Sequence, residues 1–512
     1  MSISIVAQSE NSYRKRLFPV CFAIIALISF LIRAKNLFLG SSFWWDEAML
    51  ADNIINRNFI ELLKPLQWFQ VAPPGYLWIT KLIASVTGYS DIGFRLVSFL
   101  TGISIPPLFF LLLYGISKNL PVSFALSFAA CVNPYLLYYS TELKPYILDV
   151  FLGVVILLLH HFKETSLIKR FYTPILLSFF VFGGLFFSYY FIIAASLIVY
   201  HCIIVKWSLL KKCLVTGFAL IMTGLTFLFL AYHHPHSEFM NTFWQSEFVN
   251  LSGGLVSAGK SLGSKVLISI QELFGLKQPK LLLVVIIFFS IFLFFKRPKS
   301  LFWLALPVVI HIGLALLQKY PITSRLELLW LVNIFYLFAI SLSNIKKPLI
   351  KYSALIIIIF LAIPWGDIPE FFLNPPITKC YFLQNFKKIP DHSTVYISES
   401  LVPAFNVESR RGTLPDTGSL DLIKGSARIK KTASTSQTYG VAFNKDCTIA
   451  EEIRSIAKPD FFVMLHLYNR YDIDTLFQEL NFNGNVDTMF CKPVLNAGGL
   501  LTDMVLHLKR NP

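Results

Sequence analysis

The stretch Phe43-Trp44-Trp45-Asp46-Glu47 directly follows the first apolar segment of the chain, and the interpretation of the rest depends on it. Two tryptophans precede two carboxylates, and Trp is enriched where a membrane meets water. The simplest explanation is helix capping by Asp46, since acidic residues suit the first turn of a helix. Neighbouring side chains on a helix point about 100° apart, so the two carboxylates would not face one target. We expect one to act as a base and the other to hold or orient the target or a cation.

The composition of the whole chain is that of a membrane protein. The 512 residues are 55% hydrophobic and 14% charged, and the mean hydropathy is +0.62. A soluble protein needs more charge than this to cover its surface. The net charge of +16 comes from basic residues in short loops between apolar segments, where they meet anionic lipid headgroups. We therefore expect no nucleic-acid partner.

The apolar segments predict roughly eleven transmembrane helices, each near the ~20 residues that cross a bilayer. The expected spans are 17–32, 93–117, 121–140, 145–161, 172–188, 189–205, 213–231, 281–295, 301–317, 326–343 and 349–364. With a cytoplasmic N-terminus every inner loop is basic, as the positive-inside rule requires. This topology places the loops at 40–92 and 232–280, the turns at 140–144 and 318–325, and the C-terminal region on the outer side.

Two segments of the first outer loop are too short or too polar to cross the membrane. Asp46–Leu63 has apolar residues at helical spacing against polar ones, which predicts an amphipathic helix lying in the interface. Ala72-Pro73-Pro74-Gly75 then breaks the chain before a second short piece over Tyr76–Val86. We expect these two helices to cover an active site.

After Pro364 the composition becomes that of a soluble domain. Short runs rich in β-forming residues at Thr394–Ser398, Phe461–Leu465 and Met504–Leu508 alternate with polar and helical stretches. We therefore expect a transmembrane domain over 1–365 and a small extracytoplasmic α/β domain over 366–512.

A second candidate motif is Glu142-Leu143-Lys144-Pro145-Tyr146, which continues to Asp149. Pro145 suits the first turn of a helix, and that start would align Glu142, Tyr146 and Asp149 on one stripe. An intramembrane Asp149 is costly unless it is paired or faces water, and a hydrogen bond to a neighbouring helix is the alternative. Lys144 would either neutralise a lipid phosphate or extend to the headgroups.

A third motif, Tyr320-Pro321 followed by Arg325, forms a short outer turn that opens a span. A guanidinium at this depth matches a phosphate, with an ion pair to Glu327 or Asp149 as the alternative. Arg95 is a second candidate of the same kind.

The run His233-His234-Pro235-His236-Ser237-Glu238 opens the large outer loop. His233, His236 and Glu238 are ligand types for zinc, although their spacing is not a recognised ligand pattern. The alternative is an interfacial loop that gates access to the site. Binding of a divalent metal is therefore one of two alternatives for this run, and no other cofactor is indicated.

Together these motifs resemble the GT-C glycosyltransferases, and within them the protein-mannosyltransferase and aminoarabinose-transferase branch (glycosyltransferase family 39 and its relatives). The resemblance covers about 13–365, and no single motif is decisive. It rests on Asp46-Glu47, Ala72-Pro73-Pro74-Gly75-Tyr76, Arg95-Leu96, Glu142-Leu143-Lys144-Pro145-Tyr146 and Tyr320-Pro321 with Arg325.

The resemblance implies a GT-C-like integral-membrane enzyme that transfers a sugar, with inversion, from a polyprenyl-phosphate donor to a hydroxyl acceptor. It implies Asp46 as the catalytic base, with Glu47 beside it. Arg325, Lys144 and Arg95 would bind the donor phosphate, although family members often carry arginine where Lys144 stands. The expected substrate contacts are Trp44, Trp45, Tyr76, Glu142, Tyr146, Asp149 and Tyr320.

The expected location is the outer face of a bacterial inner membrane. The partners would be the lipid-linked sugar donor, membrane lipid, and an acceptor that is a lipid, a glycan or a protein. A transporter or lipid flippase is the alternative function. It would explain the spans and Asp149, but it makes no use of an outer loop carrying Asp46-Glu47 and two interfacial helices.

Overall fold

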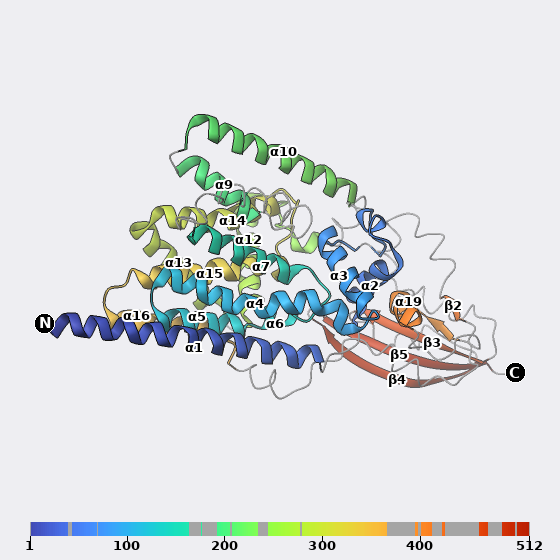
Figure 1. Ribbon diagram of the computed structural model, residues 1–512. Helices are drawn as coiled ribbons and strands as arrows, with labels where there is room; N and C mark the ends of the chain where they lie inside the picture. Colours follow the sequence, from blue (N-terminus) through green and yellow to red (C-terminus); the bar gives the residue numbers. More distant parts are fainter. Residues whose placement is uncertain are drawn as a thin grey trace.

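A computed structural model gives the arrangement of most of the chain. It describes residues 2–38, 43–68, 70–162, 176, 192–204, 207–233, 244–276, 279–365, 395–397, 401–411, 422–424, 460–468, 484–496 and 499–510. A bundle of helices forms most of the molecule, and a five-stranded sheet lies at the end of the bundle opposite the N-terminus (Figure 1).

Apolar helices form the bundle. Four described helices are long and apolar enough to cross a membrane: α1 (Ser2–Phe38, through its part Arg16–Phe38), α4 (Asp91–Ser117), α13 (Pro279–Lys296) and α14 (Pro298–Leu316). Four shorter apolar helices accompany them: α5 (Leu120–Cys131), α7 (Tyr146–Phe162), α15 (Leu328–Ser343) and α16 (Pro348–Ala362). The bundle is completed by α9 (Ile192–Ile204) and α10 (Leu209–His233). The chain is therefore a multi-pass membrane protein, and the number of eleven spans stays a prediction.

The span expected over 121–140 is divided into two helices. α5 ends at Cys131, and α6 (Pro134–Tyr139) begins after Asn133, whose side chain accepts a hydrogen bond from the Leu136 amide at 3.0 Å. Pro134 has no N–H to continue α5 but fits the first turn of a new helix. The expected span 172–188 lies outside the described residues except for residue 176.

An additional helix, α12 (Gly254–Phe274), occupies part of the loop expected at 232–280. Its buried residues Ile270, Leu273 and Phe274 recur at helical spacing and pack into the main core of the bundle. Its first half contains Gly, Ser and Lys residues, so α12 is less apolar than the described helices that could cross a membrane.

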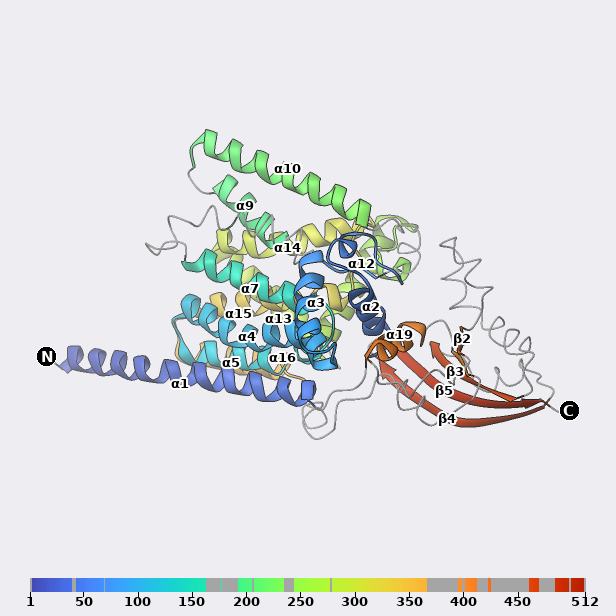
Figure 2. The ribbon, with the colours of Figure 1, turned by 45° about the vertical axis from the view of Figure 1, so that its right-hand side comes forward.

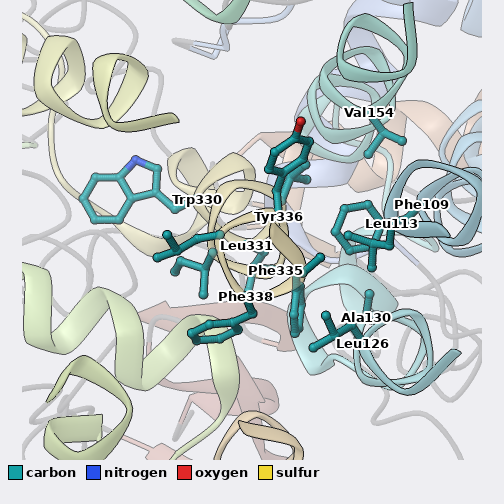
Figure 3. Close-up of a cluster of buried hydrophobic side chains, with 14 of the residues drawn as sticks. Phe109, Leu113, Leu126, Ala130, Val154, Trp330, Leu331, Phe335, Tyr336 and Phe338 are labelled. Carbon is teal, nitrogen blue, oxygen red and sulfur yellow. The ribbon is translucent and has the colours of Figure 1, made fainter. Parts of the chain in front are cut away.

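The core of the bundle surrounds α15, in which every residue from 328 to 342 is buried. Figure 3 shows Phe335 of this helix facing Phe109 and Leu113 of α4, with Leu126 and Ala130 of α5 close by. The ring centroids of Phe109 and Phe335 lie 6.0 Å apart, edge to face. A helix that is apolar on all sides must be surrounded by other apolar groups. For α15 these groups are the side chains of neighbouring helices.

The C-terminal sheet has the strand order β2-β1-β3-β5-β4. The strands are β1 (Val395–Ile397), β2 (Leu422–Lys424), β3 (Asp460–Tyr468), β4 (Gly484–Asn496) and β5 (Gly499–Arg510). β1 is parallel to β2 and β3, whereas β5 is antiparallel to β3 and β4. The three runs of β-forming residues noted in the sequence fall in β1, β3 and β5. β4 lacks that pattern because it contains residues such as Lys492 and Pro493, which are tolerated on an edge strand.

Three short helices connect the bundle to the sheet: α2 (Trp45–Asn56), α3 (Pro74–Val86) and α19 (Val402–Arg411). The helix expected over Asp46–Leu63 ends at Asn56, and a separate 3-10 turn η1 covers Glu61–Leu63. A second hydrophobic cluster unites these elements and includes Leu50, Leu77, Val407 and Met464. As a result α19 lies between α2 and the sheet (Figure 2).

Candidate functional site

The structure brings together a carboxylate and an ammonium group from distant parts of the sequence. Asp46 lies in the first turn of α2, and Lys144 lies in the turn that precedes α7. Asp46 Oδ2 and Lys144 Nζ are 2.8 Å apart. The Lys144 side chain is 6% exposed and that of Asp46 is 20% exposed. The ion pair is therefore largely desolvated, and the Asp46 side chain keeps a partial exposure.

Gln70 joins both members of this pair. Its Nε2 donates to Asp46 Oδ1 at 2.8 Å, and its Oε1 accepts from Lys144 Nζ at 3.0 Å. Only one orientation of the amide satisfies both bonds, since the oxygen must face the ammonium and the nitrogen must face the carboxylate. Gln70 was not predicted from the sequence. Its only local signal is a single polar residue between aromatic residues and the break at Ala72-Pro73-Pro74-Gly75.

The electrostatics of the site keep Asp46 ionised. Burial disfavours its charged form, but the positive charges of Lys144 and Arg325 and the bonds from Lys144 and Gln70 outweigh burial. The pKa of Asp46 therefore lies below its ordinary value. Arg325 lies in the 3-10 turn η4 (Ser324–Leu326), and its Cζ is 4.4 Å from the centroid of the Trp244 ring. The positive charge of Arg325 is one of the two that lower the pKa of Asp46.

Glu47 makes a different set of contacts from its neighbour. It is fully buried, and both of its oxygens bind Arg95: Nε donates to Oε1 at 2.9 Å and Nη2 donates to Oε2 at 2.6 Å. The Leu143 amide donates to the same Oε1 at 2.7 Å. Glu47 thereby ties α2 to α4 and to the turn that carries Lys144. The guanidinium of Arg95, which is 3% exposed as a residue, is directed at Glu47.

The cap of α2 is also formed by Glu47. Trp44 occupies the N-cap position, and its backbone amide donates to Glu47 Oε2 at 3.4 Å in a capping box. Asp46 is not the cap, because Glu47 at the third position is the residue that reaches back to the Trp44 amide. This leaves the Asp46 side chain available for Lys144 and Gln70.

Two of the expected substrate contacts bind each other. Trp44 Nε1 donates to Glu142 Oε2 at 2.7 Å, which joins the first loop to the turn before α7. Glu142 belongs to that turn and not to the helix, because α7 begins at Tyr146. The expected stripe of Glu142, Tyr146 and Asp149 therefore has only its last two members on the helix. Asp149 is 9% exposed.

The remaining candidates lie in different surroundings. Tyr76 is fully buried on α3, and its hydroxyl lies 3.4 Å from Ser98 Oγ of α4. Tyr320 packs against the buried His311, with ring centroids 5.1 Å apart. The side chains of Trp45 and His233, together with His236 and Glu238, lie outside the described part of the structure. Within the part that is described, no group of three or more His, Cys, Asp and Glu side chains could hold a metal ion.

Two crystal structures are among the solved structures that are similar to this chain. The apo form of ArnT from Cupriavidus metallidurans has 12% sequence identity and a TM-score of 0.40, covering 96% of this chain and 98% of that chain. The same enzyme bound to undecaprenyl phosphate has 12% identity and a TM-score of 0.42, covering 95% and 97%. No protein-family model matches the sequence, and no curated protein matches it.

Proposed function

We propose that this protein is a glycosyltransferase that moves a sugar from a polyprenyl-phosphate donor to a hydroxyl group of a lipid, glycan or protein acceptor. The reaction would take place at the extracytoplasmic face of a bacterial inner membrane. The observation that supports this proposal best is the constellation of Asp46, Lys144 and Gln70, with the charge of Arg325 acting on the same carboxylate. A partly exposed carboxylate beside cationic side chains suits a reaction that removes a proton and releases an anion.

The cations would hold the donor phosphate. Arg325 offers a planar fork of donors, and Lys144 offers a compact charge; both types bind phosphate oxygens. Lys144 is paired with Asp46. An incoming phosphate would draw this positive charge away from Asp46 and add a negative charge nearby. Both changes raise the pKa of Asp46, so donor binding would make it a better base.

The chemical step then follows. Asp46 accepts the proton of the acceptor hydroxyl while the hydroxyl oxygen attacks the anomeric carbon. The bond between that carbon and the phosphate oxygen breaks, polyprenyl phosphate leaves with the bonding electrons, and the configuration inverts. Lys144 and Arg325 stabilise the charge that develops on the leaving phosphate, and such preorganised contacts are among the largest contributions to catalysis.

Glu47 and Arg95 would serve as positioning residues in this mechanism. Their ion pair is buried, and Glu47 also holds the Leu143 amide beside Lys144. The pair therefore fixes the distance between the first turn of α2 and the turn at Lys144. Trp44 and Glu142 connect the same two segments by a second hydrogen bond.

The test uses the purified full chain in lipid nanodiscs with synthetic polyprenyl-phosphate sugars. We expect sugar transfer coupled to release of free polyprenyl phosphate, and Asp46→Asn should abolish both while donor binding is retained. Glu61→Gln, outside the site, is the matched control. Unchanged turnover of Asp46→Asn would remove that residue from the mechanism. Movement of intact lipid between leaflets without release of polyprenyl phosphate would instead identify a flippase.

A further inference from the structure

The last residue of α19, Arg411, contacts the residues that support the site. Its Cζ lies 4.8 Å from the centroid of the Phe43 ring and 5.7 Å from that of Phe94. Its Nη2 lies 2.8 Å from Asp91 Oδ1, and its Nη1 lies 3.0 Å from Glu408 Oε1. The side chain is only 8% exposed. Two carboxylates and two aromatic rings thus fix the position of this guanidinium.

The ring of Phe43 connects Arg411 to the buried ion pair. Arg95, which binds Glu47, has its Cζ 5.0 Å from the centroid of the same ring. Phe43 and Phe94 meet edge to face, with centroids 5.4 Å apart. A single buried ring therefore contacts a guanidinium from α4 and a guanidinium from α19. Phe43 stands directly before Trp44, the N-cap residue of the helix that carries Asp46.

A second contact joins α19 to the same helix further along. Asn406 Nδ2 donates to Asp52 Oδ2 at 3.4 Å, and Trp68 Nε1 donates to the same oxygen at 2.7 Å. Asp52 belongs to α2, and Trp68 precedes Gln70 by two residues. α19 therefore contacts α2 directly, and it is linked to the segment of Gln70 through Asp52, which binds both Asn406 and Trp68. Its apolar residues Ala404 and Val407 lie in the hydrophobic cluster shared with α2 and α3.

We propose that Arg411 is a positioning residue, and that α19 is the element through which the C-terminal region keeps Asp46, Lys144 and Gln70 in their reactive arrangement. The inference rests on the proposed function and adds a role for the C-terminal region. Arg411 holds the ring of Phe43 in place, and Phe43 holds the start of α2. The start of α2 in turn sets the orientation of the Asp46 carboxylate. A displacement of about 1 Å at a reacting group can lower a rate by roughly 100-fold. A change at Arg411 that shifts the Asp46 carboxylate by this amount would therefore have a measurable effect on the rate.

The test compares three variants of the full chain in nanodiscs. Arg411→Ala removes the guanidinium, Arg411→Lys keeps a charge for Asp91 without the planar group, and Arg410→Ala is the control at the exposed neighbouring position. Two quantities are measured: the kinetics of sugar transfer, and hydrogen exchange of peptides covering residues 43–57. The exchange measurement needs no substrate, so it tests the positioning even if no sugar is transferred.

For Arg411→Ala we expect kcat to fall by roughly 10- to 100-fold with the donor KM changed less than about threefold, and faster exchange over residues 43–57. Arg411→Lys should recover part of kcat, and Arg410→Ala should match the wild type. Unchanged kcat and exchange in Arg411→Ala would overturn the inference. So would a loss of folded protein with wild-type kcat in the folded fraction, since that result indicates a purely structural role.

Two further outcomes separate the inference from the proposed function. If Arg411→Ala does not fold, Asp91→Asn removes the opposite member of the ion pair and should accelerate exchange over the same residues. If the wild type transfers no sugar while Arg411→Ala still accelerates exchange over residues 43–57, the proposed function fails and the coupling of α19 to the Asp46 segment stands.

Discussion

Lys144 Nζ lies 2.8 Å from Asp46 Oδ2, whereas the adjacent carboxylate of Glu47 is occupied by Arg95 and the Leu143 amide. Two neighbouring acids thus have separate tasks. One is accessible, held by two side-chain donors and close to the charge of Arg325. The other is sealed inside the protein and joins three segments of the chain.

The first prediction concerns pH. Because the pKa of Asp46 in the free protein lies below its ordinary value of about 3.9, its ion pair stabilises the fold above that pH and is lost as the pH falls through the lowered pKa. The acid limb of kcat/KM, which reports the free enzyme, should therefore lie below about pH 4. The acid limb of kcat should lie at higher pH, because the bound phosphate raises the pKa of Asp46. Steady-state kinetics of sugar transfer between pH 3 and 8 give both profiles, and acid limbs of kcat and kcat/KM at the same pH would contradict the prediction.

The second prediction concerns Gln70. Gln70→Leu removes one hydrogen-bond partner from Asp46 and one from Lys144, so we expect kcat to fall by about tenfold. Gln70→Glu places a second negative charge beside Asp46 and should move the acid limb of kcat/KM to higher pH. The control is Gln67→Ala, at an exposed position nearby. A Gln70→Glu profile identical to that of the wild type would show that Gln70 does not face the ionised carboxylate.

The third prediction concerns stability. Glu47→Gln leaves the Arg95 guanidinium buried without its full counter-charge, and breaking a buried pair in this way costs about 3–5 kcal/mol. The melting temperature should fall by several degrees. The control is Lys265→Gln, which removes a more exposed pair with Glu247 at 3.7 Å; such pairs contribute about 1 kcal/mol or less. Equal melting temperatures for the two variants would contradict the assignment of Glu47 as a buried support.

The fourth prediction concerns Arg325. Arg325→Ala removes a positive charge that lowers the pKa of Asp46 and a phosphate ligand in the proposed mechanism. The donor KM should rise by about tenfold, as expected for the loss of one charge-assisted hydrogen bond. Lys319→Ala, an exposed position in the same turn, is the control. Calorimetric titration with a polyprenyl phosphate checks the affinity, and equal binding by both variants would exclude Arg325 from the phosphate site.

Part of the architecture is determined by the sequence alone. A lipid environment demands apolar segments of about 20 residues, and this requirement leaves a composition pattern that can be counted along the chain. The break at Ala72-Pro73-Pro74-Gly75 is equally local, since Pro74 suits a helix start, and α3 begins there. Asp46-Glu47 and Lys144 are likewise indicated as candidate site residues by charges placed beside apolar segments.

Only the tertiary structure decides which charged side chains form ion pairs with each other. Asp46 and Glu47 are adjacent and share one local sequence, so no pattern indicates that Lys144 takes the first and Arg95 the second. That choice depends on how α4 and the turn before α7 pack against α2. The contacts of Gln70 and Arg411 could not be predicted from the sequence for the same physical reason. Their partners come from distant segments, and contacts between distant segments leave no periodic signal in the chain.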